Sequence, residues 1–530
     1  MPQCDKSCTQ PLKRALAFAR RRSVEAKRST SQRPNWYTNS KKGSFLLFNS
    51  YTFIFFFLPF TFFIYFYLNK KHQTQAGKAF LVAGSLFFYS WWNIVYLPLI
   101  IVSMLANYTL GRYLSSSQKS GTAKHSKLLL TLGVVFNLGL LGYYKYADFF
   151  LDNLNTLFDT HLDLLHLALP LAISFYTFQQ IAYLVDSYRS ETKEYDFLNY
   201  AVFVTFFPQL IAGPIVHHAE MMPQFSRMQN KRVNYRNIAT GLFIFAIGLF
   251  KKVVIADTFA QWANLGFDQA QTLTMLDAWM TSLSYTFQLY FDFSGYTDMA
   301  IGAALLFNIK LPINFNSPYK ALSIQDFWRR WHITLSRFLR DYLYIPLGGN
   351  RKGGSRTYLN LFLTFLLGGI WHGAGWTFVL WGALHGAAMM FHRAWQKRGW
   401  VMHSALAWLI TFNFINVTWV FFRANSFEDA IKVLHGMFVG PLVLPSAITS
   451  RLAFLESLGV ESGSWSTLFY REPIILAWLL AGFVLVLFFK NSMELQQRFK
   501  PNLYHLLATV LLLLSLFMLS RKSEFIYFNF

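Results

Sequence analysis

The stretch that decides the fold is residues 357–392, TYLNLFLTFLLGGIWHGAGWTFVLWGALHGAAMMFH. It contains no Asp, Glu, Lys or Arg, and it exceeds the roughly 20 apolar residues that a membrane-spanning helix needs. His372 lies deep inside this run, between glycines in residues 368–373, GGIWHG. An ionisable side chain is costly to bury in such a run, so His372 is a candidate functional residue.

Other uncharged runs flank this stretch on both sides. Those long enough to span a membrane are residues 43–69, 79–111, 164–185, 197–219, 399–422 and 501–520. Shorter apolar runs occupy residues 128–144, 237–250, 278–291 and 473–489. The pattern predicts an all-α polytopic membrane protein with about 10 to 12 transmembrane helices. The lipid bilayer is therefore expected to be one of its binding partners.

Composition supports this interpretation and excludes others. Hydrophobic residues make up 54% of the 530 residues and charged residues 14%, with 57 Phe in the apolar set. The net charge of +23 comes mostly from short loops and tails, a pattern typical of cytoplasmic loops, so we expect no nucleic-acid partner. The two cysteines, Cys4 and Cys8, lie in the N-terminal tail and predict neither a disulfide framework nor a cysteine metal site.

Four segments are expected along the chain. Residues 1–44 are basic and lack an apolar period, which predicts a disordered tail. The sequence from Leu46 resembles a natural N-terminus, so we expect the tail to reflect an early start assignment. Residues 45–520 form the polytopic domain, with 292–356 as a polar re-entrant or interfacial core, and residues 521–530 form an aromatic C-terminal tail.

The polar core contains residues 326–332, DFWRRWH, in which His332 follows cationic and aromatic residues. This mixture favours an interfacial helix, with Trp328 and Trp331 at the depth of the lipid headgroups. A positive-inside loop with an aromatic belt is the alternative. Because this segment is expected at the surface, His332 is expected to guard or orient the entrance for a donor.

Neutral imidazoles in an apolar tunnel suit acyl transfer. Such a ring can take a proton from an attacking hydroxyl and return it to a leaving thiolate. The alternative for His372 is a structural bond to a carbonyl of a neighbouring helix. A metal site combining His332 and His372 with His385 or His392 lacks the usual ligand spacing, so no metal is expected.

Other motifs are absent or ambiguous. Asp292 and Asp298 can pair with arginine, orient a catalytic group or serve the fold alone. The sequence contains no Gly-x-Ser-x-Gly elbow, and no Walker loop or dinucleotide fingerprint in a suitable context, so hydrolases, ATPases and dehydrogenases lose support.

Five motifs together resemble a known family, the membrane-bound O-acyltransferases (MBOAT). They are residues 206–214 (FFPQLIAGP), 291–296 (FDFSGY), 327–351, 368–373 (GGIWHG) and 419–423 (WVFFR). The resemblance covers residues 45–530 and is strongest to the bacterial branch of alginate O-acetylation proteins, which is related to the teichoic-acid D-alanylation protein. It implies an MBOAT fold around a central funnel or tunnel.

The resemblance also implies roles for individual residues. His372 corresponds to the near-invariant catalytic histidine and His332 to a second polar residue of the active site. Apart from the resemblance, we expect Trp371, Asp292 and Asp298 to be supporting residues. The acyl group would come from a cytoplasmic thioester, acetyl-CoA or an acyl carrier, without a bound cofactor. Residues 342–351, YLYIPLGGNR, resemble the alginate type, so acetyl is the expected acyl group.

Further expectations follow for donor, partner and location. The arginines that would bind donor phosphates are Arg329, Arg330, Arg337 and Arg340. Tyr527 is a candidate acyl relay, and an interfacial aromatic anchor is its alternative role. We expect a multi-pass protein of the bacterial cytoplasmic (inner) membrane that works with a periplasmic or extracellular acetyltransferase on an exopolysaccharide or cell-envelope glycan.

Two rival functions stay open at this point. One is D-alanyl transfer to teichoic acid, which uses a different acyl group. The other is a transporter or polysaccharide flippase, in which the histidines would relay protons.

Overall fold

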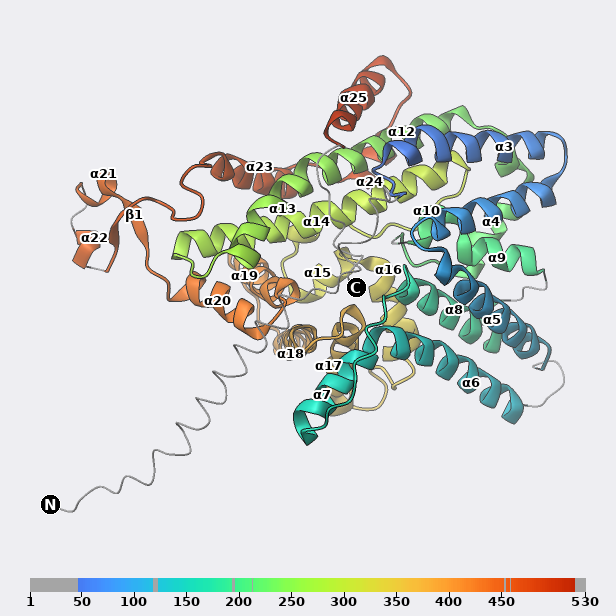
Figure 1. Ribbon diagram of the computed structural model, residues 1–530, viewed down its shortest axis with the longest axis horizontal. Coiled ribbons are helices and arrows are strands. Elements are labelled where there is room, and N and C mark those ends of the chain that lie inside the picture. Colours follow the sequence, from blue (N-terminus) through green and yellow to red (C-terminus); the bar gives the residue numbers. More distant parts are fainter. Residues whose placement is uncertain are drawn as a thin grey trace. The chain divides into compact units, whose positions relative to one another are not determined.

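The computed structural model describes residues 46–117, 123–192, 196–211, 213–451, 454–457 and 459–519. The regular secondary structure of these residues is almost entirely helical, which confirms the all-α polytopic class (Figure 1). Within these ranges, the strands are β1 (Val443–Pro445) and β2 (Glu461–Gly463), which pair in parallel with Val443 opposite Glu461.

The helices of the first half alternate long apolar elements with short turns. They are η2 (Phe53–Phe57), α3 (Leu58–Lys70), α4 (Thr74–Ser90), η3 (Ile94–Tyr96), α5 (Leu97–Ser117), α6 (Ala123–Leu141), η5 (Gly142–Tyr146), α7 (Ala147–Phe158), α8 (Ile173–Tyr188), α9 (Phe197–Thr205), α10 (Phe207–Leu210), α11 (His218–Ser226), η6 (Met228–Lys231), α12 (Tyr235–Phe250), η7 (Lys251–Ala256), α13 (Asp257–Asn264) and η8 (Leu265–Gln269).

The second half contains the longest helix and a hairpin of two long helices. Its elements are α14 (Met275–Leu306), η9 (Pro318–Lys320), α15 (Ile324–Arg330), α16 (Ile333–Leu339), η10 (Arg340–Tyr344), α17 (Gly354–His372), α18 (Trp376–Lys397), α19 (Ser404–Arg423), α20 (Phe427–Phe438), α21 (Ser446–Thr449), α22 (Phe454–Ser457), α23 (Ile474–Phe488), α24 (Ser492–Arg498), α25 (Leu503–Leu513) and η11 (Leu514–Met518).

Five helices of the described chain are long and apolar enough to cross a membrane, or six if one bent pair counts as a single span. The five are Phe53–Lys70, Ile94–Ser116, His125–Phe158, Tyr235–Gln269 and Ser404–Arg423, and the bent pair is Ile474–Phe488 with Ser492–Arg498. This number is below the expected 10 to 12. One reason is that apolar runs break into short helices, as where Phe206 separates α9 from α10 ahead of Pro208.

Helix α14 is the buried centre of the fold. It begins at Thr274, whose hydroxyl accepts a hydrogen bond from the Asp277 amide, and every residue from Ser284 to Leu306 is buried. Figure 1 shows it running beside α12 and α13. A helix covered on all sides must match its neighbours in shape and polarity, because neither water nor lipid reaches it.

Glycines bring α12 and α14 into backbone contact. A Cβ atom added at Gly248 would lie 2.5 Å from the Gly295 carbonyl oxygen, and one added at Gly302 would lie 2.6 Å from the Gly241 carbonyl oxygen. Gly241 and Gly248 are seven residues apart in α12, and Gly295 and Gly302 are seven residues apart in α14. Each pair therefore lies on one face of its helix. The two helices therefore approach as closely as only glycine permits.

Buried ion pairs hold the same two helices beyond the glycine contacts. Lys251 and Lys252 are neighbours in η7, the π-helical turn that follows α12. The Lys251 Nζ lies 2.7 Å from Asp298 Oδ2, and the Lys252 Nζ lies 2.6 Å from Asp292 Oδ1. Burying one member of such a pair without the other is strongly unfavourable, so the pairs fix the register of α12 against α14.

The expected polar core of residues 292–356 begins inside α14, because Asp292 lies in the middle of a continuous helix. The pairing of Asp292 and Asp298 with lysines lets the helix continue through both carboxylates. After α14 the chain is extended to residue 317, and short helices follow.

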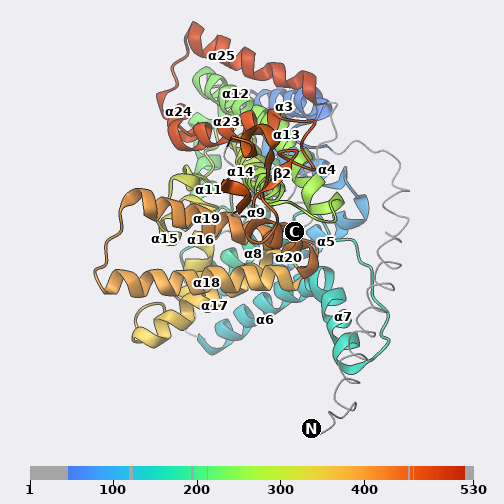
Figure 2. The same cartoon turned by 90° about the vertical axis from the view of Figure 1, so that its left-hand side faces the viewer.

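Helices α17 and α18 form a tight antiparallel hairpin and lie side by side in both views (Figures 1 and 2). A Cβ at Gly369 would lie 2.8 Å from the Gly382 Cα, and one at Gly382 would lie 2.7 Å from the Phe365 carbonyl oxygen. The glycines around His372 therefore serve close helix packing, one of the two uses that an open backbone allows.

The glycine contact between α12 and α14 predicts the outcome of one substitution. Gly248→Ala places a methyl group against backbone atoms of α14, which cannot move aside, and should lower the free energy of unfolding by about 1–3 kcal/mol. Gly139→Ala in α6 is the control, since no atom lies within 4 Å of its added Cβ. Thermal unfolding in detergent measures both, and equal midpoints would contradict the contact.

Candidate active site

His372 is the last residue of α17, in the bend that leads to α18. Gly373 follows with an extended backbone (φ −161°), so the helix stops at the histidine. The ring is 3% exposed and packs edge-on against Trp371, Trp381 and Phe422, with centroid distances of 4.9, 5.2 and 5.1 Å. Aromatic walls therefore hold the imidazole at the end of a helix.

His332 occupies the break between α15 and α16. Its backbone is left-handed (φ +44°), a conformation that costs most residues other than glycine about 1–2 kcal/mol. The side chain is 0% exposed and meets Phe293 of α14 edge-on at 4.8 Å. A strained backbone at a fully buried histidine is typical of a functional position.

A chain of hydrogen bonds fixes the tautomer of His332. The Thr334 amide donates to Asn314 Oδ1 over 3.2 Å, so this side-chain atom of Asn314 is the acceptor oxygen. His332 Nδ1 lies 3.2 Å from the same oxygen and must therefore carry the hydrogen. The Thr334 hydroxyl also donates to Asn314 Oδ1, at 2.9 Å, and accepts from the Ile215 amide at 3.1 Å.

The remaining nitrogen of His332, Nε2, therefore presents a lone pair. It is buried and makes no hydrogen bond to any residue that the structure describes. Burial also lowers the pKa of His332 from its ordinary value, so the ring is neutral near pH 7. Such a nitrogen can accept a proton or a hydrogen bond from a hydroxyl group.

The expectation that His332 lies in a surface segment is wrong. Trp328 and Trp331, which precede it, are 7% and 2% exposed, so they do not face lipid headgroups. Trp331 packs between Tyr319 and Trp419, and the Trp328 indole donates to His385. The chain around His332 is held by protein partners distant in sequence.

Trp371 lies between the two histidines. Its ring centroid is 4.9 Å from that of His372 and 6.5 Å from that of His332, so both imidazoles share one aromatic neighbour. On its other side Trp371 stacks on Phe178 of α8 at 4.8 Å, and Phe178 stacks on Phe338 of α16 at 4.1 Å. The stack ties three helices together beside the histidines.

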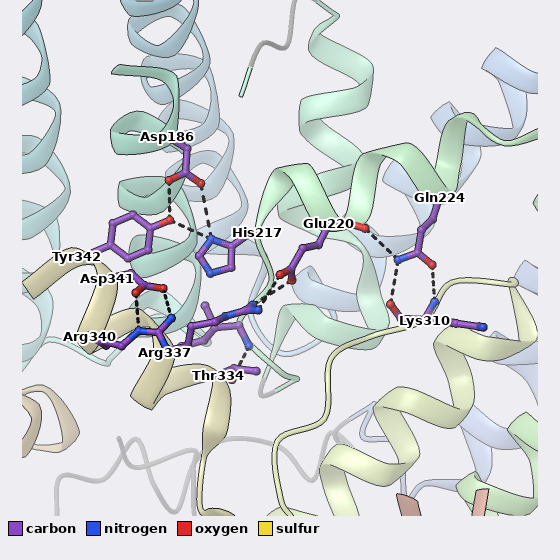
Figure 3. Close-up of polar contacts among 11 residues, drawn as sticks. Asp186, His217, Glu220, Gln224, Lys310, Thr334, Arg337, Arg340, Asp341 and Tyr342 are labelled. Atoms are coloured by element: carbon purple, nitrogen blue, oxygen red, sulfur yellow. Dashed lines mark hydrogen bonds and ion pairs between the residues drawn. The ribbon is translucent and has the colours of Figure 1, made fainter. Parts of the chain in front are cut away.

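The stack continues to a polar cluster that Figure 3 shows. Phe338 packs on Tyr342 at 4.8 Å, and the Tyr342 hydroxyl donates to Asp186 Oδ1 at 2.6 Å. His217 Nδ1 lies 2.9 Å from the same hydroxyl oxygen. Burial, followed by the Asp186 carboxylate, raises the pKa of the Tyr342 phenol, so it remains a protonated donor.

Comparison with known proteins identifies the family of this chain. Residues 83–428 match the MBOAT family, the membrane-bound O-acyltransferases. The chain belongs to this family. It is therefore a multi-pass membrane protein and an acyltransferase, and the histidine pair lies within the matched region.

Named relatives of this acyltransferase act on different acceptors. The chain is 51% identical to a peptidoglycan O-acetyltransferase of Helicobacter pylori, over 92% of this chain and 98% of the relative. It is 41% identical to a probable alginate O-acetylase of Pseudomonas aeruginosa, over 74% and 75%. A teichoic acid D-alanyltransferase of Bacillus subtilis is 28% identical, over 49% and 69%.

The four arginines expected to bind the donor of this MBOAT protein have different surroundings. Arg337 forms a bidentate pair with Glu220 at 2.7 and 3.0 Å, as Figure 3 shows. Arg330 pairs with Asp326, Arg340 pairs with Asp341, and Arg329 is exposed. Three of the cations therefore have a carboxylate partner, and donor binding stays a prediction.

Of the three expected supporting residues, the structure brings only Trp371 between the histidines. Asp292 and Asp298 pair with Lys252 and Lys251 instead of an arginine or a histidine. These contacts favour a structural role for the two aspartates over pairing with arginine or orienting a catalytic group.

His385 has a complete set of hydrogen bonds. The Trp328 indole donates to its Nδ1 at 3.1 Å, so its Nε2 carries the hydrogen and donates to the Thr418 hydroxyl at 3.1 Å. Thr418 in turn donates to the Ile415 carbonyl at 2.9 Å. Across the described ranges no group of three His, Cys, Asp or Glu is arranged to hold a metal ion, and the expectation of no metal stays a prediction.

Several expectations fall on residues outside the described part of the chain. Tyr527, the C-terminal tail and residues 1–44 belong to this group. The implied funnel or tunnel also stays a prediction. Two surface hollows lie away from the histidines. One, of about 540 Å³, is lined by residues of α20 and by 271–273, and the other by Tyr51 and α25.

Sequence reasoning missed the residues that orient His332. Asn314 lies 18 residues before His332 in an extended segment, and no motif marks it. Thr334 and Ile215 complete the chain, and Ile215 directly follows the FFPQLIAGP motif of residues 206–214. The available signals were the proximity of Ile215 to that motif and the position of Thr334 within the motif of residues 327–351.

The tautomer of His332 predicts a substitution that separates chemistry from folding. His332→Asn keeps a residue that tolerates the left-handed backbone but removes the Nε2 lone pair, so acyl transfer should fall roughly 100-fold or more. The folded fraction should stay close to that of the wild type, measured by size-exclusion chromatography and thermal unfolding. Wild-type turnover in a folded His332→Asn protein would contradict a role for Nε2.

Proposed function

We propose that this acyltransferase moves acetyl from a cytoplasmic thioester for O-acetylation of a cell-envelope glycan, with peptidoglycan as the acceptor. The single observation that carries the choice of acceptor is the 51% identity to a relative named as a peptidoglycan O-acetyltransferase, of which 98% is covered. The probable alginate O-acetylase is less similar and is covered over 75%.

The histidine pair supports an acyl-transfer mechanism. We assign His372 the role of base, which removes the proton as the attacking hydroxyl oxygen bonds to the acetyl carbonyl carbon. The carbon–sulfur bond then breaks, and the proton passes to the leaving thiolate. His332, which presents a lone pair at Nε2, accepts a hydrogen bond from a second hydroxyl of the acceptor and so orients the acceptor for attack.

The proposal includes the donor, the partners and the membrane. Acetyl-CoA or an acyl carrier supplies the thioester. Of the four arginines suited to its phosphates, Arg329 is exposed and has no carboxylate of the described residues within ion-pair distance. A periplasmic or extracellular acetyltransferase completes transfer to the polymer, and the protein resides in the bacterial inner membrane.

Peptidoglycan chemistry tests the proposal directly. Deletion of the gene should remove O-acetyl groups from muropeptides measured by mass spectrometry, and the wild-type gene should restore them. His372→Ala should fail to restore them at equal protein level. The control is His435→Ala, an exposed histidine on α20, which should restore them fully.

Other outcomes would replace the proposal with a rival function. Loss of O-acetyl groups from another polymer with intact muropeptides would change the acceptor. Loss of D-alanine esters would favour the D-alanyltransferase function. Full restoration by His372→Ala would remove the acyl-transfer mechanism, and glycan export without a donor would favour a transporter.

Tyr527 generates a separate prediction. If its phenol carries the acetyl group between the membrane centre and the partner, Tyr527→Phe should abolish glycan O-acetylation while protein level stays normal. Phe528→Tyr in the Tyr527→Phe background tests whether position matters, and it should not restore the modification. Full activity in Tyr527→Phe would exclude the relay.

A further inference from the structure

Lys145 is a cation inside a candidate membrane span and belongs to none of the expected site residues. It lies in the π-helical turn η5, within the span His125–Phe158. Among the residues that the structure describes, no carboxylate lies within ion-pair distance of its Nζ. A cation without a carboxylate is expensive at this depth, so its other contacts must compensate.

Those contacts are the carbonyl groups at the end of α17. The Lys145 Nζ donates to the Trp371 carbonyl at 2.6 Å, to the His372 carbonyl at 3.1 Å and to the Ser174 hydroxyl at 3.3 Å. The neighbouring Tyr146 hydroxyl donates to the Ile370 carbonyl at 2.7 Å. The last three carbonyls of α17 are thus bonded by side chains of η5, although they have no partner within the helix itself.

The contacts suit an ammonium group. Three oxygens surround Nζ, and the charged form has three hydrogens to donate to them. A neutral amine has two hydrogens and would use its lone pair only if the Ser174 hydroxyl donated to it. The cation also lies over the Trp371 ring, 5.7 Å from the centroid, which attracts positive charge further.

The position of this charge affects His372. The C-terminus of a helix carries partial negative charge, which stabilises a cation placed there. Without Lys145, that terminus would favour the protonated form of His372, which cannot accept a proton. With Lys145 bound to the same carbonyls, a positive charge already occupies the terminus.

The titratable groups that act on His372 come from three elements. They are His332 at the start of α16, His385 in α18 and Lys145 in η5. The α19 residue that packs against His372 is Phe422, which does not titrate. From α8, Ser174 contacts Lys145 and does not titrate either. His385 is held in a neutral tautomer by Trp328 and Thr418, and burial keeps His332 neutral. Lys145 is therefore the cation in this set.

We propose that Lys145 is a positioning residue for acyl transfer: its ammonium group fixes the end of α17 and keeps the His372 imidazole in the neutral, proton-accepting form. This inference rests on the proposed role of His372 as base. Lys145 itself touches neither donor nor acceptor, because all three of its hydrogens are engaged by the protein.

Acetyl transfer in membranes with purified acyl donor tests the role, through kcat, KM and the pH profile of kcat. Lys145→Met removes the charge and should lower kcat roughly 10- to 100-fold with KM for the donor unchanged. Because no cation then opposes protonation of His372, the acid limb of the profile should move to higher pH by about one unit.

Two further variants separate charge from shape. Lys145→Arg retains charge and donors, so it should recover most of kcat and return the acid limb to its wild-type position. Lys127→Met removes an exposed lysine of α6 and should match the wild type in every parameter. Thermal unfolding of each protein shows whether the fold is retained.

The possible failures are distinguishable. Wild-type kcat and pH profile in Lys145→Met, while His372→Ala is inactive, would overturn the inference and leave the proposed function intact. A lower kcat with an unmoved acid limb and no recovery in Lys145→Arg would also overturn it, in favour of a purely structural role. Activity that survives His372→Ala would instead overturn the proposed function.

Discussion

The backbone contact between α12 and α14 is the constraint on which the rest of the structure depends. Gly248 and Gly295 allow the two helices to meet, and the pairs of Lys251 and Lys252 with aspartates of α14 fix their register. This contact holds α14 at the centre of the fold. From there α14 presents Phe293 to the His332 ring, and the segment after it carries Asn314 to His332 Nδ1.

The two histidines are held in position by different structural features. His372 ends a helix, and its backbone is held by side chains from η5, so its position follows from helix termination. His332 lies in a strained break between short helices, and its ring is oriented by hydrogen bonds from distant segments. Trp371 lies between them, so a shift in either element would move both imidazoles.

Sequence reasoning worked where the deciding information is local. The uncharged run of residues 357–392 predicted a buried His372 correctly, and its glycines allowed either close helix packing or close approach of a ligand, of which the structure shows the packing. It failed at His332, because charged residues of 326–341 suggested a surface, whereas partners far along the chain bury that ring. Lys145 was missed for the same reason, since its acceptors lie 226 and 227 residues away.

The buried lysine–aspartate pairs also constrain how the protein is made. Lys251 and Lys252 follow α12, whereas their partners Asp292 and Asp298 are synthesised later, in α14. Lys252 also pairs with Asp257, five residues further along the chain, whereas the carboxylate paired with Lys251 is Asp298 of α14. Before α14 emerges, release of α12 and η7 into lipid is therefore unfavourable, because the unpaired charge of Lys251 there costs several kcal/mol. We therefore expect α12 and α14 to leave the insertion machinery together. Formation of the ion pairs between η7 and α14 is then a required step in membrane assembly.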